Sequence, residues 1–190
     1  MDNITKIVMI YNQFIKNELI NKKFARNSVF GICEPMTNKK KTVPAFYNKE
    51  EAKPIVIDVT SDIWIYHKIK SSTYRTLQTK SFARTNVVEQ TTNMKLIAAF
   101  NRKLSLTQMD IEQLITAALN QKISREELIK TNFKSITINV ANTSYDRSAI
   151  YRSEWGISES ELHSNFQLLE IDYRVTCTYN SVCAINICCN

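Results

Sequence analysis

The chain has 190 residues, 44% of them apolar and 23% charged, and its net charge is +7. This composition predicts a single packed globular domain over residues 1–190. Gly31 and Gly156 are its only glycines, which excludes a glycine-rich phosphate loop or a dinucleotide-binding fingerprint.

No apolar stretch reaches the roughly 18 residues that a membrane span needs, so we expect no contact with a membrane. The opening residues MDNITKIVMIYNQF lack the basic start and the continuous apolar centre of a signal peptide. We therefore expect the protein in the cytosol of some cell, or in a particle assembled there. Thiols in that compartment normally stay reduced.

The first predicted element is a helix from about Ile4 to Leu19, with Asp2 or Asn3 as its cap. Its apolar residues share one helical face, and they are Ile4, Ile7, Val8, Tyr11, Phe14, Ile15 and Leu19. Short strands are expected at 27–34 and 42–48, around a basic loop that contains Lys39, Lys40 and Lys41.

Residues 54–69 alternate between apolar and polar types, which predicts one long strand or two strands separated near Ser61. Trp64 and Tyr66 lie on the more polar face of this segment, where they are available to a second layer or a partner. Residues 71–85 are polar without a clear period. We interpret them as the tip of a protruding hairpin or arm that spans about 66–88.

A strand is predicted within 86–103, and a helix begins at Thr107, where Asp110 completes a near capping box. A short helix follows Ser124, and a strand covers 133–145. Residues 146–165 are predicted to be a loop before a final strand pair. The expected fold class is α+β, a mostly antiparallel sheet carrying the N-terminal helix and the second helix.

Charge is unevenly distributed along the chain. No acid occurs between Asp62 and Glu89, whereas five basic residues do, and they are Lys68, Lys70, Arg75, Lys80 and Arg84. The segment from Glu154 to Asp172 is acidic, with Glu159, Glu161 and Glu170 between these ends. Such a chain could pair head-to-tail with copies of itself; the plainer interpretation is two solvated faces.

Four of the five cysteines fall in the last twenty residues, IDYRVTCTYNSVCAINICCN. Their spacing does not offer the two close pairs that structural zinc requires. Alternation instead predicts a strand through Cys177, a turn at Asn180-Ser181, and a return strand through Cys183 to Cys189. Cys177 and Cys183 are then small residues on apolar faces rather than ligands, whereas the exposure of Cys188 and Cys189 stays open. The reducing compartment disfavours disulfides.

No motif of an enzyme is recognisable, and we expect no cofactor and no metal. A cysteine nucleophile would need a neighbouring base, and neither His67 nor His163 is placed beside one by a local motif. Basic residues with Tyr66, Tyr74 and Phe82 between them have the composition of single-strand binders. Nucleic-acid binding therefore stays open as the alternative, and a small cysteine-dependent enzyme is a weaker third hypothesis.

The order of elements resembles that of head–tail connector and tail-terminator ring proteins of tailed bacteriophages. The segments that carry the resemblance are KIVMIYNQFIKNELI, PIVIDVTSDIWIYHKI, NMKLIAAFNRK, IEQLITAALNQ and LLEIDYRVTCTY. The block from Ala149 to Cys183 also resembles neck proteins of crAss-like phages. The polar 71–85 arm and the basic 38–42 loop depart from the pattern.

The resemblance implies a structural virion protein, assembled in the bacterial cytoplasm, that forms a homo-oligomeric ring around the DNA channel. Its partners would be the portal, other neck or tail proteins, and DNA contacted nonspecifically. The residues expected at subunit contacts are Trp64, Tyr66, Lys68, Lys70, Tyr74, Arg75, Lys80, Arg84, Glu154, Trp155, Glu159 and Glu161. Lys39, Lys40 and Lys41 are expected to face DNA or an acidic partner.

Overall fold

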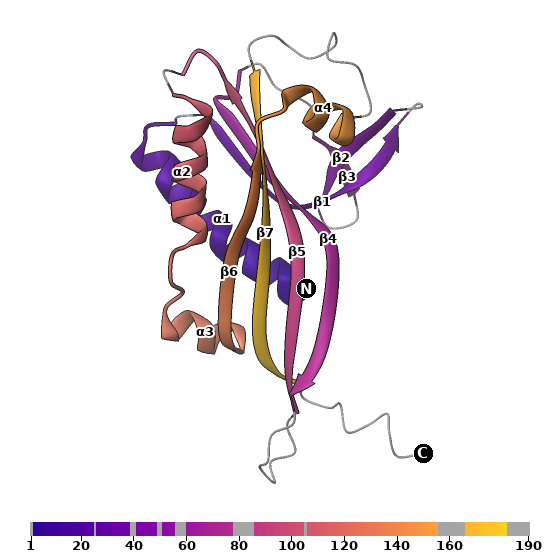
Figure 1. Ribbon diagram of the computed structural model, residues 1–190, viewed down its shortest axis with the longest axis vertical. Helices are drawn as coiled ribbons and strands as arrows, with labels where there is room; N and C mark the ends of the chain where they lie inside the picture. Colours follow the sequence, from indigo (N-terminus) through magenta and orange to yellow (C-terminus); the bar gives the residue numbers. More distant parts are fainter. Residues whose placement is uncertain are drawn as a thin grey trace.

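The structure is a computed structural model that describes residues 2–24, 26–38, 41–48, 51–55, 60–77, 86–104, 106–155 and 166–181. Figure 1 shows helices on both faces of one long, twisted sheet. The helices are α1 (Asn3–Asn21), α2 (Gln108–Leu119), α3 (Arg125–Thr131) and α4 (Arg147–Trp155). The strands are β1 (Asn27–Asn38), β2 (Lys41–Asn48), β3 (Glu51–Pro54), β4 (Ile63–Leu77), β5 (Asn86–Asn101), β6 (Phe133–Ser144) and β7 (Phe166–Ser181).

The seven strands are ordered β3-β2-β1-β4-β5-β7-β6. Every neighbouring pair is antiparallel except β1 and β4, which are parallel. The α+β class and the mostly antiparallel sheet are thus confirmed.

Helix α1 packs on one face of the sheet through its predicted apolar stripe. Asp2 caps the helix by accepting a hydrogen bond from the Thr5 amide at 2.6 Å, and Ile15 and Leu19 are completely buried. Helix α2 lies beside α1 on the same face and begins with a complete capping box between Thr107 and Asp110. The short helix predicted after Ser124 is α3, where the Ser124 hydroxyl accepts a hydrogen bond from the Glu127 amide at 3.1 Å. All three predicted helices and their caps are confirmed.

Helix α4 corrects the prediction of a loop at 146–165, because residues 147–155 form a helix. The Asp146 carboxylate accepts a hydrogen bond from the Ala149 amide at 2.9 Å and so caps its first turn. The helix covers the sheet face opposite α1 (Figure 1), where Ile150 and Trp155 join a second apolar cluster. Residues 156–165 lie outside the described residues.

The polar segment 71–77 is strand, which agrees with the hairpin and not with the arm of the two predicted alternatives. It continues β4 and pairs in register with β5, for example Thr73 with Thr91 and Leu77 with Val87. The strand is hard to recognise because both of its faces are polar there. Residues 78–85, the rest of the predicted arm, lie outside the described residues.

The predicted turn at Asn180-Ser181 is wrong, because β7 continues through both residues and Asn180 pairs with Val87. The strand through Cys177 is confirmed, and this cysteine is completely buried. Both edges of β7 are already paired, with β5 on one side and β6 on the other. The predicted return strand through Cys183 to Cys189 lies outside the described residues, and β7 offers it no open edge.

Candidate functional site

Four residues expected at subunit contacts are buried inside the chain instead. Trp64 and Tyr66 are 3% and 2% exposed, and both lie beneath α4, which contributes the buried Trp155 to the same cluster. Trp64 stacks on Phe166, and the Tyr66 ring meets Trp155 edge-on. The fourth is Glu154, also buried. The expectation of exposed aromatic residues on this face is therefore corrected: these side chains join α4 to the sheet.

The charges on this face form ion pairs within the chain. Glu154 accepts hydrogen bonds from the Tyr66 hydroxyl at 2.9 Å and from Lys68 Nζ at 2.9 and 3.1 Å. Burial and the Glu154 carboxylate raise the pKa of Tyr66 well above its usual value. Further ion pairs join Lys70 to Asp172 at 3.1 Å and Lys95 to Glu170 at 2.8 Å.

These ion pairs change the interpretation of the uneven charge. Glu154, Glu170 and Asp172 belong to the acidic segment, whereas Lys68 and Lys70 belong to the basic one. The two segments neutralise part of each other where the sheet brings them together. These residues were candidates for charge pairing between copies. In the structure they pair within one chain instead.

Of the remaining predicted contact residues, some are exposed and others lie outside the described part of the chain. Tyr74 is 65% exposed, and Arg75 is also exposed, both on β4. Lys41 is the first residue of β2. The predicted residues outside the described part of the chain are Lys39, Lys40, Lys80, Arg84, Glu159 and Glu161.

A hydrogen-bonded chain of buried polar groups connects α1 to the centre of the sheet. His67 Nδ1 lies 2.7 Å from the Tyr173 hydroxyl, and its Nε2 lies 2.8 Å from Asn12 Oδ1. The Asn12 amide nitrogen donates to the Phe30 carbonyl at 2.9 Å. This orientation makes Nε2 the protonated nitrogen and Nδ1 the acceptor from Tyr173.

The His67 network is built for structure rather than for proton transfer. Burial lowers the pKa of His67 to about 3, so the ring is neutral at physiological pH. The side chain is completely buried, and a general base must reach its substrate. His67 therefore locks α1 to β4 and β7.

The two described cysteines lack the properties of nucleophiles. Burial raises the pKa of Cys33 to about 12 and that of Cys177 to about 11, so both remain thiols at neutral pH. Within the described ranges, no group of three or more His, Cys, Asp or Glu side chains could hold a metal ion. Cys183, Cys188 and Cys189 lie outside those ranges.

Beyond α4, the same sheet face becomes polar and open to solvent. Its side chains bond to one another: Asn93 donates to Ser71 at 3.0 Å, and Arg174 Nε donates to Asn93 at 3.0 Å. The rungs across β4, β5, β7 and β6 are Ser71-Asn93-Arg174-Asn139 and Thr73-Thr91-Thr176-Thr137. Because these groups satisfy one another, the face does not require a covering layer.

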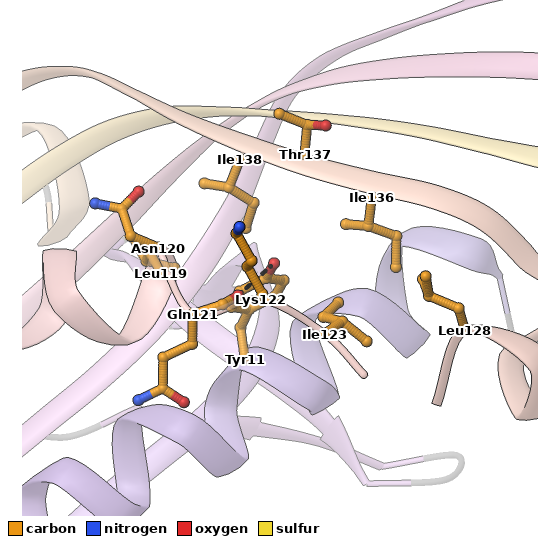
Figure 2. A pocket seen from close by; sticks show the side chains of 10 residues that line it. All are labelled: Tyr11, Leu119, Asn120, Gln121, Lys122, Ile123, Leu128, Ile136, Thr137 and Ile138. Carbon is orange, nitrogen blue, oxygen red and sulfur yellow. Dashed lines mark hydrogen bonds between the residues drawn. The ribbon is translucent and has the colours of Figure 1, made fainter. Parts of the chain in front are cut away.

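The outer edge of β6 differs from every surface above. Within the described part of the chain this strand pairs only with β7, so its other edge, here called the open edge, carries backbone groups without a partner strand. A pocket of about 380 Å³ lies beside it. Figure 2 shows Ile136 and Ile138 pointing from β6 toward this pocket, whereas Thr137 points away.

The pocket lies between β6, α1 and the segment that joins α2 to α3. Its apolar lining is formed by Tyr11, Leu119, Ile123, Leu128, Ile136 and Ile138 (Figure 2). The Tyr11 hydroxyl lies 3.5 Å from the Gln121 carbonyl, and burial raises the Tyr11 pKa to about 12. Asn120, Gln121 and Lys122 add polar groups to this lining, so the pocket presents apolar side chains beside a polar rim.

Sequence reasoning missed this site. The alternation of Ile136, Ile138 and Val140 predicted the strand, but not its place at the end of the sheet. A signal was available in the composition of β6, whose single charged residue is Lys134. Its meaning depends on the strand order, which the sequence pattern does not contain.

No helix among the described residues is long and apolar enough to cross a membrane. Neither a protein-family model nor a curated protein matches this chain.

Proposed function

We propose that this chain is a structural subunit of a ring in the neck or tail connector of a tailed bacteriophage. The element order supports this assignment: an N-terminal helix, an antiparallel sheet with a long hairpin, a second helix on the sheet, and a late strand. The resemblance described above supports the assignment to phage neck proteins. The described buried polar groups serve packing, which is consistent with a non-enzymatic role.

One observation carries the proposal that the chain assembles. The open edge of β6 is twelve residues long with a single charge, and apolar side chains line the pocket beside it. Soluble proteins normally protect such an edge with charges, proline, bulges, a short strand or a cover. Strand β6 has bulges near both ends, but its stretch at about 135–140 is regular. A subunit whose edge is covered by a neighbour needs no such protection.

Nucleic-acid binding receives less support than it did from the sequence. Lys68 and Lys70, two of the five cations in the 68–84 stretch, are held by Glu154 and Asp172. Arg75 stays exposed, and the other cations of that stretch lie outside the described residues. A ring around DNA requires no more than weak contact with the phosphate backbone.

Electron microscopy of the purified full chain tests the ring. We expect particles of one size with a central opening and a constant number of subunits, because a heterologous contact whose rotation closes produces a ring. Two-subunit particles, or filaments without closure, would contradict the proposal. Purified phage particles from the natural host should also contain the chain in a fixed ratio to the portal protein.

A further inference from the structure

The two terminal strands of the sheet are protected to very different degrees. Strand β3 has four residues, of which Glu51 and Lys53 are charged and Pro54 cannot donate a backbone hydrogen bond. Strand β6 has twelve residues, no proline and only Lys134 as a charge. Bulges interrupt its pairing with β7 near both ends, which leaves regular strand at about 135–140. One end of the sheet is thus closed to further strands and the other is open.

The pocket determines what kind of strand the open edge would accept. Ile136 and Ile138 point to one side of β6 and Thr137 to the other (Figure 2). A strand added to this edge would continue the same alternation. Its inward side chains would meet the apolar lining at Leu128 and Ile138, so they should be apolar.

Residues 182–190, VCAINICCN, have this composition. They contain no charge, no proline and no glycine, and Cys183, Ile185, Ile187 and Cys189 share one side of an extended chain. Nine extended residues span about 30 Å. The regular part of β6 needs about 20 Å.

The direction of the chain after β7 disfavours pairing of residues 182–190 with β6 of the same chain. Strand β7 finishes beside the start of β6, where Tyr179 pairs with Phe133. A segment that turned back from there would run parallel to β6 and would have to cross it first. Stepping over the end of β6 to reach its far edge takes about 10 Å, two strand spacings, of the roughly 30 Å that these residues span, and a parallel pair is slightly less stable per residue than an antiparallel one.

We infer that residues 182–190 of a neighbouring copy add an antiparallel strand to the open edge of β6. Ile185 and Ile187 enter the side of β6 that carries Ile136 and Ile138, and Cys188 lies on the side of Thr137. The inference deepens the proposed ring, on which it rests, by naming the contact between subunits. In a ring each copy gives its strand to one neighbour and receives a strand from the other, which is a heterologous contact.

Disulfide trapping in the full chain tests this contact. Thr137→Cys places a thiol on the exposed side of β6, and the control Thr73→Cys places one on the exposed stretch of β4 beyond its pairing with β1. Cys33 and Cys177 are buried and do not compete. Each variant is mixed with an equal amount of its isotopically heavy form, allowed to exchange subunits, and oxidised mildly; linked peptides are identified by mass spectrometry.

We expect a disulfide between position 137 and residues 182–190 in most Thr137→Cys chains, with Cys188 as the partner. Mixed light and heavy pairs show that the link joins two chains. Adding Cys188→Ser should remove the link, and Thr73→Cys should form none. A link that is absent, confined to one chain, or formed equally from position 73 overturns the inference.

The result also separates this contact from the ring itself. An assembly of constant size without the cross-link leaves the ring standing and overturns the strand exchange. A cross-link within closed pairs supports the strand exchange and contradicts the ring. A chain that stays monomeric and forms no link contradicts both.

Discussion

At the scale of single residues, His67 shows how burial determines the role of an ionisable group. Its ring is fully enclosed and hydrogen-bonded on both nitrogens, by Tyr173 and Asn12. The same residue in a solvent-facing pocket would be a candidate base. Here the neutral ring connects α1 to the sheet, and protonation would remove the acceptor that Tyr173 needs.

The pKa of His67 predicts a pH-dependent stability. Its pKa is about 3 in the folded protein and about 6.5 when exposed. The unfolded chain therefore binds a proton between these values that the folded chain does not. The His67 contribution is fully present above about pH 6.5 and is lost at about 1.4 kcal/mol per unit as the pH falls toward 3.

Urea unfolding of the wild type and His67→Gln measures this effect. Between about pH 7 and pH 5, the wild type should lose about 2 kcal/mol more unfolding free energy than the variant. Carboxylates titrate in both proteins, so the difference between them isolates His67. Equal slopes in the two proteins would show that His67 is not held neutral by burial.

Glu154 is the other residue whose environment determines its role. Its side chain is 1% exposed, whereas that of Lys68 is 26% exposed. Lys68→Met leaves a buried carboxylate without its cation and should lower the unfolding free energy by about 3 kcal/mol. The double variant Lys68→Met/Glu154→Gln should recover much of this loss, because it removes the unpaired charge.

Lys70→Met provides the matched control for that measurement. Lys70 also pairs with a carboxylate, but the two side chains are 49% and 25% exposed. Its substitution should cost less than about 1 kcal/mol, as for other surface pairs. Similar losses in Lys68→Met and Lys70→Met, or no recovery in the double variant, would contradict the special role of Glu154.

At the scale of elements, α4 is held by its cap and by its packing on the sheet. The Asp146 carboxylate accepts from the Ala149 amide, and Trp155 Nε1 lies 3.5 Å from the Ile55 carbonyl. Asp146→Ala should lower the unfolding free energy by about 1 kcal/mol, whereas Asp146→Asn retains a capping oxygen and should cost less. Chemical denaturation compares the two, and equal losses would exclude a capping role.

The elements that the sequence predicts well are those whose burial repeats regularly. Helix α1 and strand β7 each have one buried side throughout, so a period of 3.6 or 2 is visible in their residues. Strand β4 is instead buried on both faces from Ile63 to His67 and exposed on both from Ile69 to Thr76, so no buried side marks its second half. Its identity there depends on pairing with β5, a contact between residues distant in sequence.

Helix α4 and the open edge were missed for related reasons. The buried residues of α4 are Ile150, Tyr151, Glu154 and Trp155, and a buried glutamate disguises the apolar stripe. The burial of Glu154 is explained only by its partners Lys68 and Tyr66, which lie far away in the sequence. The open edge depends on which strand is last in the sheet, which local patterns do not specify.

At the scale of the whole molecule, the open sheet edge supports assembly more strongly than the uneven charge does. The uneven charge that suggested contacts between copies is partly used inside the chain, by Lys68 with Glu154 and Lys70 with Asp172. The sheet instead has one protected end at β3 and one open end at β6. This asymmetry is suited to a heterologous contact, which a closed ring requires.

Native mass spectrometry of the purified full chain over a range of concentrations tests the assembly most directly. The account predicts one dominant species whose mass is a fixed whole multiple, three or more, of the 22.0 kDa chain. Its stoichiometry should remain constant as concentration rises, because a closed ring adds no further subunits. A 22.0 kDa monomer at every concentration, even with neck proteins present, would contradict the account.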